Sequence, residues 1–192
     1  MNDDRNAAQQ DVRTITETSA FKTWFLDSKV TDRLGRPMRL YHGTARDFDA
    51  FNPDNKAHFF TPDPSFADGF AFNACIHERD EARDGREVVM PVFLKARKPF
   101  DPRTPECAAL MKKWGLGKAS DYNYAEWDLL QDIEIITRIR ALGYDGIWMR
   151  EEARFDTIAV FEPNQIKSAI GNNGEFDPTS PSITGHQEPA LR

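Results

Sequence analysis

Short apolar segments of strand length recur through the middle of this 192-residue chain. The segments 38–41, 58–61, 88–94, 145–149 and 156–161 are rich in β-branched and aromatic residues, as strands are. Helical patterns do not alternate with them regularly, as a doubly wound parallel sheet would require. The pattern therefore predicts an α+β fold with a largely antiparallel sheet.

Two segments have the apolar spacing of a helix. Phe21, Trp24 and Phe25 stand at i, i+3 and i+4, which predicts a short helix ending near Ser28. A longer apolar period runs over 124–142 and is followed by Gly143, a residue suited to end a helix. A third helix is expected after the turn at 62–65, which supplies its cap.

The ends of the chain differ in composition from the middle. Residues 1–18 and 178–192 contain few apolar side chains, so we expect flexible tails there. The remaining residues, 19–177, are enough for one domain with a single core.

Overall composition argues against several classes of function. A net charge of -6 disfavours an extended electrostatic grip on nucleic acid. Cys75 and Cys107 lack metal-ligand spacing, and no apolar run reaches the roughly 20 residues that span a bilayer. No glycine-rich phosphate loop is present, so an NAD site here would not be a Rossmann site. We expect a cytoplasmic protein without a metal and without a membrane role.

The segment Tyr41-His42-Gly43-Thr44 is expected at the end of a strand. An imidazole next to glycine offers a side-chain donor and an unhindered backbone that a flat ligand can approach. By itself, such a dipeptide is more often a feature of a turn.

Aromatic and acidic residues gather in two later segments. Phe59 and Phe60 precede a turn and are followed by Phe66 and Phe70, so that two rings can sandwich a flat ligand. The alternative is that these rings belong to the core. Acidic residues in the 151–156 hairpin flank two apolar strands, and such carboxylates are most often only solvated.

Taken in this order, the segments resemble the ADP-ribosyltransferase superfamily, and within it the phage-encoded group found in polyvalent proteins. The resemblance covers about 21–177. It rests on Tyr-His-Gly-Thr at 41–44, Phe-Thr-Pro-Asp-Pro at 60–64, Tyr-Asp-Gly at 144–146 and the Val-Phe-Glu-Pro-Asn-Gln-Ile-Lys-Ser segment at 160–168. It implies two packed, mostly antiparallel sheets with flanking helices around an NAD cleft.

The resemblance also implies roles for individual residues. The histidine of the first motif, here His42, holds a ribose hydroxyl of NAD, and Gly43 hydrogen-bonds the nicotinamide carboxamide. Phe59 or Phe60 stacks on nicotinamide, with Phe70 as the second face, where the family often has tyrosine. The residues expected to contact NAD are Tyr41, His42, Gly43, Thr44, Phe59, Phe60, Thr61 and Phe70.

The third motif of the superfamily supplies a carboxylate that stabilises the oxocarbenium ion formed as nicotinamide leaves. Glu152 is our first candidate, Asp156 the second and Glu151 the third, with His42 as the other catalytic residue. Gln165 either holds the acceptor or the loop, or caps the short turn that follows it.

The function implied is mono-ADP-ribosyl transfer from NAD to a macromolecule by a phage or bacterial effector. A host protein is the favoured acceptor because the chain is acidic, and a nucleic acid is the alternative. An NAD glycohydrolase and a non-catalytic binding module on the same fold are the competing hypotheses. The replacement of the family's tyrosine by phenylalanine leaves the second of these open.

Overall fold

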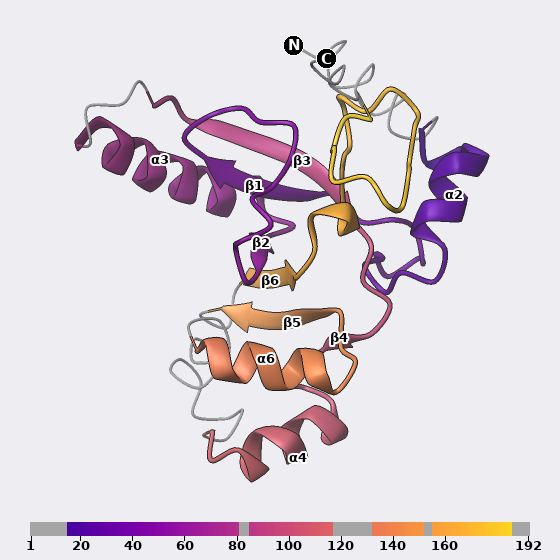
Figure 1. Cartoon of the computed structure of the whole chain (residues 1–192), viewed down its shortest axis with the longest axis vertical. Helices are drawn as coiled ribbons and strands as arrows, with labels where there is room; N and C mark the ends of the chain where they lie inside the picture. Colours follow the sequence, from indigo (N-terminus) through magenta and orange to yellow (C-terminus); the bar gives the residue numbers. More distant parts are fainter. Residues whose placement is uncertain (1–14, 81–84, 117–131, 152–154, 186–192) are drawn as a thin grey trace, which may run out of the picture.

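The computed structural model describes residues 15–80, 85–116, 132–151 and 155–185, and it has the predicted α+β architecture (Figure 1). The first sheet has the order β1-β3-β7, made of Leu40–Thr44, Val88–Leu94 and Ile166–Ser168. The second has the order β2-β6-β5-β4, made of His58–Phe60, Phe155–Val160, Gly146–Glu151 and Pro99–Phe100. Every pairing is antiparallel except that of β4 with β5.

Helices cover the outer faces of the two sheets. They are α2 (Ser19–Phe25), α3 (Pro64–Asp80), α4 (Pro105–Lys113) and α6 (Ile133–Ala141), with the 3-10 turn η1 at Pro163–Gln165. Figure 1 shows α3 beside β1, and α6 and α4 stacked below β5. Among the described residues, no helix has both the length and the apolar character needed to cross a membrane.

Side-chain caps set the starts of these helices. The Asp63 carboxylate accepts hydrogen bonds from the Ser65 and Phe66 amides, and so caps α3 in the turn where a cap was predicted. The Asp132 carboxylate likewise accepts from Glu134 N at 2.7 Å, and Asp132 itself is extended. A continuous helix over 124–142 is therefore wrong, because α6 begins at Ile133. Residues 124–131 of that prediction lie outside the described residues.

Each face of the sheets buries a separate apolar cluster. Between the sheets, Leu40, Val92 and Leu94 of the first sheet pack with Phe60, Ile158 and Val160 of the second. On the other face of the second sheet, Ile147 and Met149 pack with apolar side chains of α4 and α6. The aromatic residues of α2 pack on Phe93 and Phe176. Alternation along each strand thus decides which cluster a side chain enters.

One expectation about the first sheet needs correction. β1 does not stop at His42-Gly43 but continues through both residues to Thr44. β3 is the central strand of this sheet although it contains Pro91, a residue type normally confined to edge strands and bulges. The carbonyl of Pro91 accepts from Ala169 N at 2.9 Å, so the backbone of Pro91 faces the β7 side of the strand. Because β7 ends at Ser168, just before Ala169, the missing N–H of Pro91 interrupts no strand pair.

The C-terminal residues are packed further than their composition suggests. A tail was expected from residue 178, yet Ser182 pairs with Ala50 and Ile183 is buried between the sheets. One apolar side chain and long-range backbone hydrogen bonds hold this segment, and neither gives a local sequence signal. Residues 186–192 lie outside the described residues.

Candidate active site

The edge of β1 that faces away from β3 has unpaired peptide groups at Gly43. Tyr41 N donates to Thr61 O at 2.8 Å, and Thr61 N donates to Tyr41 O at 3.1 Å. Because peptide groups of an antiparallel strand point alternately to its two neighbours, those of Gly43 point to the same edge as those of Tyr41. Among the described residues, none forms a hydrogen bond with Gly43 on this edge. One N–H and one C=O are thus presented side by side.

Glycine is required at position 43 by a helix. A Cβ built there would overlap the Ala67 carbonyl and lie 2.7 Å from Ala71 N, both in α3. The expectation that the missing side chain makes room for a ligand is therefore corrected: the backbone of α3 fills that space. The peptide edge of Gly43, and not its Cα, is the part left open.

The chain opposite Gly43 bends away and leaves a gap. Thr61 is paired with Tyr41, so a continued ladder would place Phe59 opposite Gly43. Phe59 instead pairs with Ala159 of β6 in the second sheet, and Figure 1 shows β2 between the two sheets. The segment 58–61 therefore passes from one sheet to the other beside Gly43.

The two elements next to this gap each carry an exposed aromatic residue. Phe59 is 38% exposed, whereas Phe60 is 2% exposed and belongs to the core between the sheets. The structure thus places Phe60 where it cannot stack on a ligand. Phe70 is 46% exposed and belongs to the turn of α3, between Ala67 and Ala71, that covers Gly43. Phe59 and Phe70 are thus exposed rings on two elements, β2 and α3, that both adjoin Gly43.

His42 of β1 forms a hydrogen bond with Phe59 of β2 across the gap. Its Nδ1 lies 2.9 Å from the Phe59 carbonyl oxygen. A carbonyl only accepts, so Nδ1 donates, and the neutral ring leaves Nε2 as an acceptor. Burial lowers the pKa of His42 below its ordinary value of 6.5, against the smaller opposing effect of the Phe59 hydrogen bond. The imidazole is therefore neutral at pH 7.

A cavity of about 690 Å³ opens beside His42, a size typical of ligand pockets. Aromatic rings pack around the histidine on this side, with Phe51 at 5.0 Å and Phe48 at 6.2 Å between ring centroids. Apolar, amide and basic side chains line the cavity. They are His42, Thr44, Phe48, Ala50, Phe51, Asn52, Asn55, Lys56, Ala57, His58, Phe59, Ile133 and Ile136.

His58 is a buried polar residue of the cavity wall, and its Nε2 atom has no hydrogen-bond partner within the part of the chain that the structure describes. Its side chain is 2% exposed. Burial, and then the nearby His42, lower the pKa of His58 to about 4. A buried polar atom without a hydrogen bond is costly, so Nε2 is a natural contact for a polar ligand atom in the cavity.

The three candidate carboxylates differ in their locations. Glu152 lies outside the described residues, and Glu151 ends β5 opposite Phe155. Asp156 is on the face of β6 that also carries Ile158 and Val160, toward the first sheet. Its Oδ1 is 3.6 Å from Arg103 Nη1, so part of its charge is compensated. Asp156 does not line the cavity beside His42.

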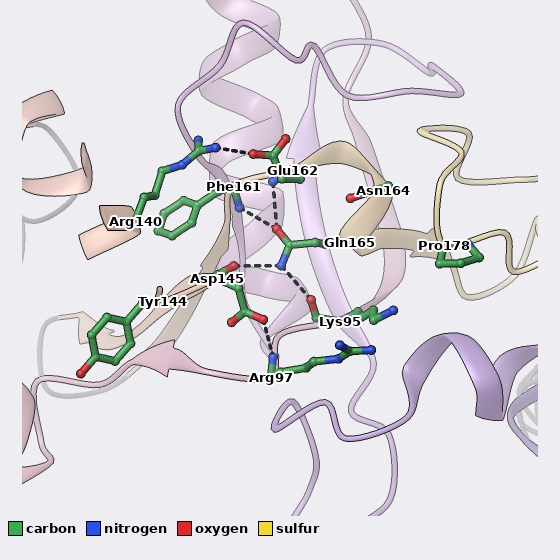
Figure 2. Close-up of a pocket in the computed structure, with 10 residues that line it drawn as sticks. All are labelled: Lys95, Arg97, Arg140, Tyr144, Asp145, Phe161, Glu162, Asn164, Gln165 and Pro178. Carbon is green, nitrogen blue, oxygen red and sulfur yellow. Dashed lines mark hydrogen bonds and ion pairs between the residues drawn. The ribbon is translucent and has the colours of Figure 1, made fainter. Parts of the chain in front are cut away.

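Gln165 has a structural role in η1 (Figure 2). Its Oε1 accepts from Phe161 N and Glu162 N, and its Nε2 donates to the carbonyls of Lys95 and Asp145, both at 2.8 Å. An amide has two donors and two acceptor positions, so this side chain is fully used. Gln165 therefore fixes the turn η1 that ends with it, whereas the expected cap on a following turn is wrong, because residues 166–168 form strand β7.

Asp145 of the Tyr-Asp-Gly motif is also structural. Its carboxylate accepts from Arg97 N at 2.7 Å and Lys98 N at 2.8 Å. Figure 2 draws it in a second cavity of about 330 Å³, where Arg140 pairs with Glu162. The Tyr-Asp-Gly motif and the segment that contains Gln165 therefore connect the two sheets, because Asp145 and Gln165 bond the residues that follow β3. Among the described residues, no group of three or more His, Cys, Asp or Glu side chains is placed to hold a metal ion.

Most of the cavity wall was not predicted from the sequence. Phe51, Asn52, Asn55, Lys56 and His58 were not among the predicted site residues, although all line the cavity. A signal was present, since Phe48 and Phe51 precede a polar turn that leads directly into β2. His58 and Phe60 also share one face of that strand by simple alternation.

Comparison with family models gives the class of the protein. Residues 32–176, more than half of the chain, match a model of ADP-ribosyltransferases. The model is that of the ADP-ribosyltransferase in polyvalent proteins, and the chain belongs to this family. No curated protein and no solved structure matches the chain in the corresponding comparisons. Membership supports an ADP-ribosyltransferase type of activity, and domains of this class use NAD as substrate.

Proposed function

We propose that the protein is a mono-ADP-ribosyltransferase that binds the nicotinamide of NAD against Gly43, between Phe59 and Phe70. The observation that carries this proposal is the open peptide edge of Gly43, with an exposed phenylalanine on each of the two elements beside it, Phe59 in β2 and Phe70 in α3. Nicotinamide is a flat ring with a carboxamide, which offers one acceptor and donors next to each other. The N–H and C=O of Gly43 complement that group, and the rings complement the flat faces.

The cavity beside His42 then takes the remainder of NAD. The Nε2 of neutral His42 is suited to accept a hydrogen bond from a ribose hydroxyl. The amides of Asn52 and Asn55 and the ammonium of Lys56 are suited to polar groups of the nucleotide half. The Nε2 of His58 adds a buried contact that the predicted site lacked.

In the reaction, the bond between the nicotinamide nitrogen and the ribose carbon breaks, and nicotinamide leaves with the bonding electrons. An acceptor heteroatom forms the new bond to that carbon and loses its proton. A carboxylate stabilises the positive charge that develops on the ribose. Glu152 remains our first candidate for it. Asp156 is second because Arg103 compensates part of its charge, and Glu151 is third.

The acceptor that we propose is a side chain of a host protein, in the cytoplasm of a bacterium. The net charge of -6 supports a protein acceptor over an extended nucleic acid. An effector role in phage infection rests on the family alone.

Labelled NAD tests the proposal in a bacterial lysate. Wild-type protein should label a macromolecule, and Phe59→Ala and Phe70→Ala should each reduce labelling about tenfold if one stacking contact is lost. Phe72→Ala is the matched control, because Phe72 is a 51% exposed phenylalanine two residues further along α3. Free ADP-ribose without a labelled macromolecule would instead indicate a glycohydrolase. Failure of the wild type to bind NAD would indicate a binding module.

A further inference from the structure

The C-terminal residues 177–185 lie against the loop that forms one wall of the cavity. Ile183 N donates to Asp49 O at 2.8 Å, and Ser168 N donates to Ile183 O at 2.8 Å. Ile183 thus bonds the end of β7 on one side and, on the other, the loop 45–57, hereafter the cavity loop. Ser182 adds an isolated antiparallel bridge to Ala50, which itself lines the cavity.

A buried lysine fixes this segment to the first sheet. Lys167 is fully buried in β7, and its Nζ donates to Ser180 O at 2.9 Å and to Ser182 O at 2.6 Å. A buried ammonium is tolerated only when its hydrogen bonds are made. Desolvation lowers the pKa of Lys167, while Asp177 and Asp49 act against this change. The hydrogen bonds from Lys167 to the carbonyls of Ser180 and Ser182 therefore fix the position of residues 177–185 on the first sheet.

Asp49 is where this segment meets the cavity loop. Its carboxylate accepts from Thr184 N at 3.2 Å and also from the Thr184 hydroxyl. Both its main chain and its side chain are thus engaged by residues 183–184. The neighbouring residues on its two sides, Phe48 and Ala50, line the cavity.

A short path of contacts leads from Asp49 to the histidine. Phe51, two residues after Asp49, packs at 5.0 Å from the His42 ring and at 5.0 Å from the His58 ring. Ile183 lies in the same buried cluster as Phe51 and Phe60. Displacement of the segment would therefore move the aromatic wall against which both histidines pack.

We propose that residues 177–185 form a strap that positions the cavity wall 45–57 for binding of NAD, with Asp49 and Lys167 as its positioning residues. The ligand in this proposal rests on the proposed function. The strap lies beyond the residues 32–176 that match the family model, so it is an addition to the matched region. Gly43 and Phe70 are held by the packing of α3 on β1, so the strap acts on NAD affinity and not on the reacting bond.

Thr184→Val tests the strap with little change of shape. It removes the hydroxyl that bonds Asp49, and Asp49→Ala removes the acceptor. Each variant should raise the KM for NAD about tenfold, which corresponds to about 1.4 kcal/mol, and should leave kcat within about twofold. Thr184→Ser should restore the wild-type KM. Thr179→Val is the matched control, because the Thr179 hydroxyl bonds Asp177 within the strap and does not contact the cavity loop.

Hydrogen exchange of residues 45–57 gives a readout that needs no ligand. Amides of this loop should exchange faster in Thr184→Val and Asp49→Ala than in wild type or Thr179→Val, with circular dichroism unchanged. Unaltered exchange together with an unaltered KM would overturn the strap. Failure of the wild type to bind NAD would overturn the proposed function, while the exchange result would still decide whether the strap orders the loop.

Discussion

The Nδ1 atom of His42 lies 2.9 Å from the carbonyl oxygen of Phe59, across the gap where β1 and β2 enter different sheets. This single contact fixes the tautomer of the imidazole and ties it to the backbone of Phe59. The same histidine packs on Phe51, and residues 183–184 of the C-terminal strap bond Asp49, two residues before Phe51. His42 is thus the point where the gap beside Gly43 and the cavity wall meet.

Stability should decrease with acidification because of the buried His58. Its native pKa of about 4 lies below the ordinary value of 6.5, so the unfolded chain binds more protons between these values. The free energy of unfolding should therefore decrease as pH falls from 6.5 toward 4, by up to about 1.4 kcal/mol per pH unit for one group. Chemical denaturation at several pH values measures this slope. His58→Gln should flatten it, whereas the exposed His77→Gln should not; equal slopes in both variants would contradict the prediction.

Gly43→Ala should destabilise the protein because a methyl group there overlaps the backbone of α3. Overpacking of this kind costs about 1 to 3 kcal/mol, to be measured by urea denaturation. Gly69→Ala, in α3 itself, is the control, because a Cβ at Gly69 meets nothing within 4 Å. That change should stabilise the protein by up to about 1 kcal/mol, since alanine is the better helix former. A Gly43→Ala protein as stable as the wild type would refute the close packing of α3 on β1.

Gln165→Glu should unfold more easily although its shape is conserved. A carboxylate cannot donate to the carbonyls of Lys95 and Asp145, so two partly buried acceptors lose their partner. We expect a loss of at least about 2 kcal/mol in the free energy of unfolding at pH 7. Asn164→Asp places the same charge one residue away and serves as control. NAD affinity per folded molecule should stay the same; a selective loss of affinity would instead give Gln165 a role in the site.

Glu152→Gln should greatly reduce the rate of transfer while NAD still binds. Removing a group that stabilises developing charge reduces kcat on the order of a hundredfold. Asp156→Asn should have a smaller effect on kcat, because Arg103 already compensates part of that charge. Single-turnover labelling with both variants and Glu151→Gln separates the three carboxylates. A larger loss of kcat in Asp156→Asn than in Glu152→Gln would reverse their order.

The fold could be predicted wherever local pattern decides it. The bounds of β3 and the α2 aromatics follow from apolar spacing, and Gly143, with φ of 78°, ends α6 as expected. The start of α6 was missed because the apolar period continues across Asp132, whose cap only the structure displays. The helix α4 and the strand β7 were not predicted. They are short, and both depend on contacts with distant parts of the chain.

The site could be predicted only in part. The motif pointed to His42 and Gly43, yet the choice between Phe59 and Phe60 needed the pairing of β2 with β6, which buries one ring and exposes the other. The structural use of Gln165 and Lys167 was also hidden, because their partners are carbonyls of residues far along the chain or in a polar segment. The sequence pattern shows that aromatic residues lie on a strand, but the pairing of that strand with its neighbour decides which aromatic ring is exposed and which is buried.

A crystal structure with bound nicotinamide tests the central claim most directly. We predict that the carboxamide oxygen accepts from Gly43 N–H, that the amide donates to the Gly43 carbonyl, and that the ring lies between Phe59 and Phe70. Nicotinamide bound elsewhere, or a Gly43 peptide edge occupied by protein atoms in the presence of saturating ligand, would contradict the account.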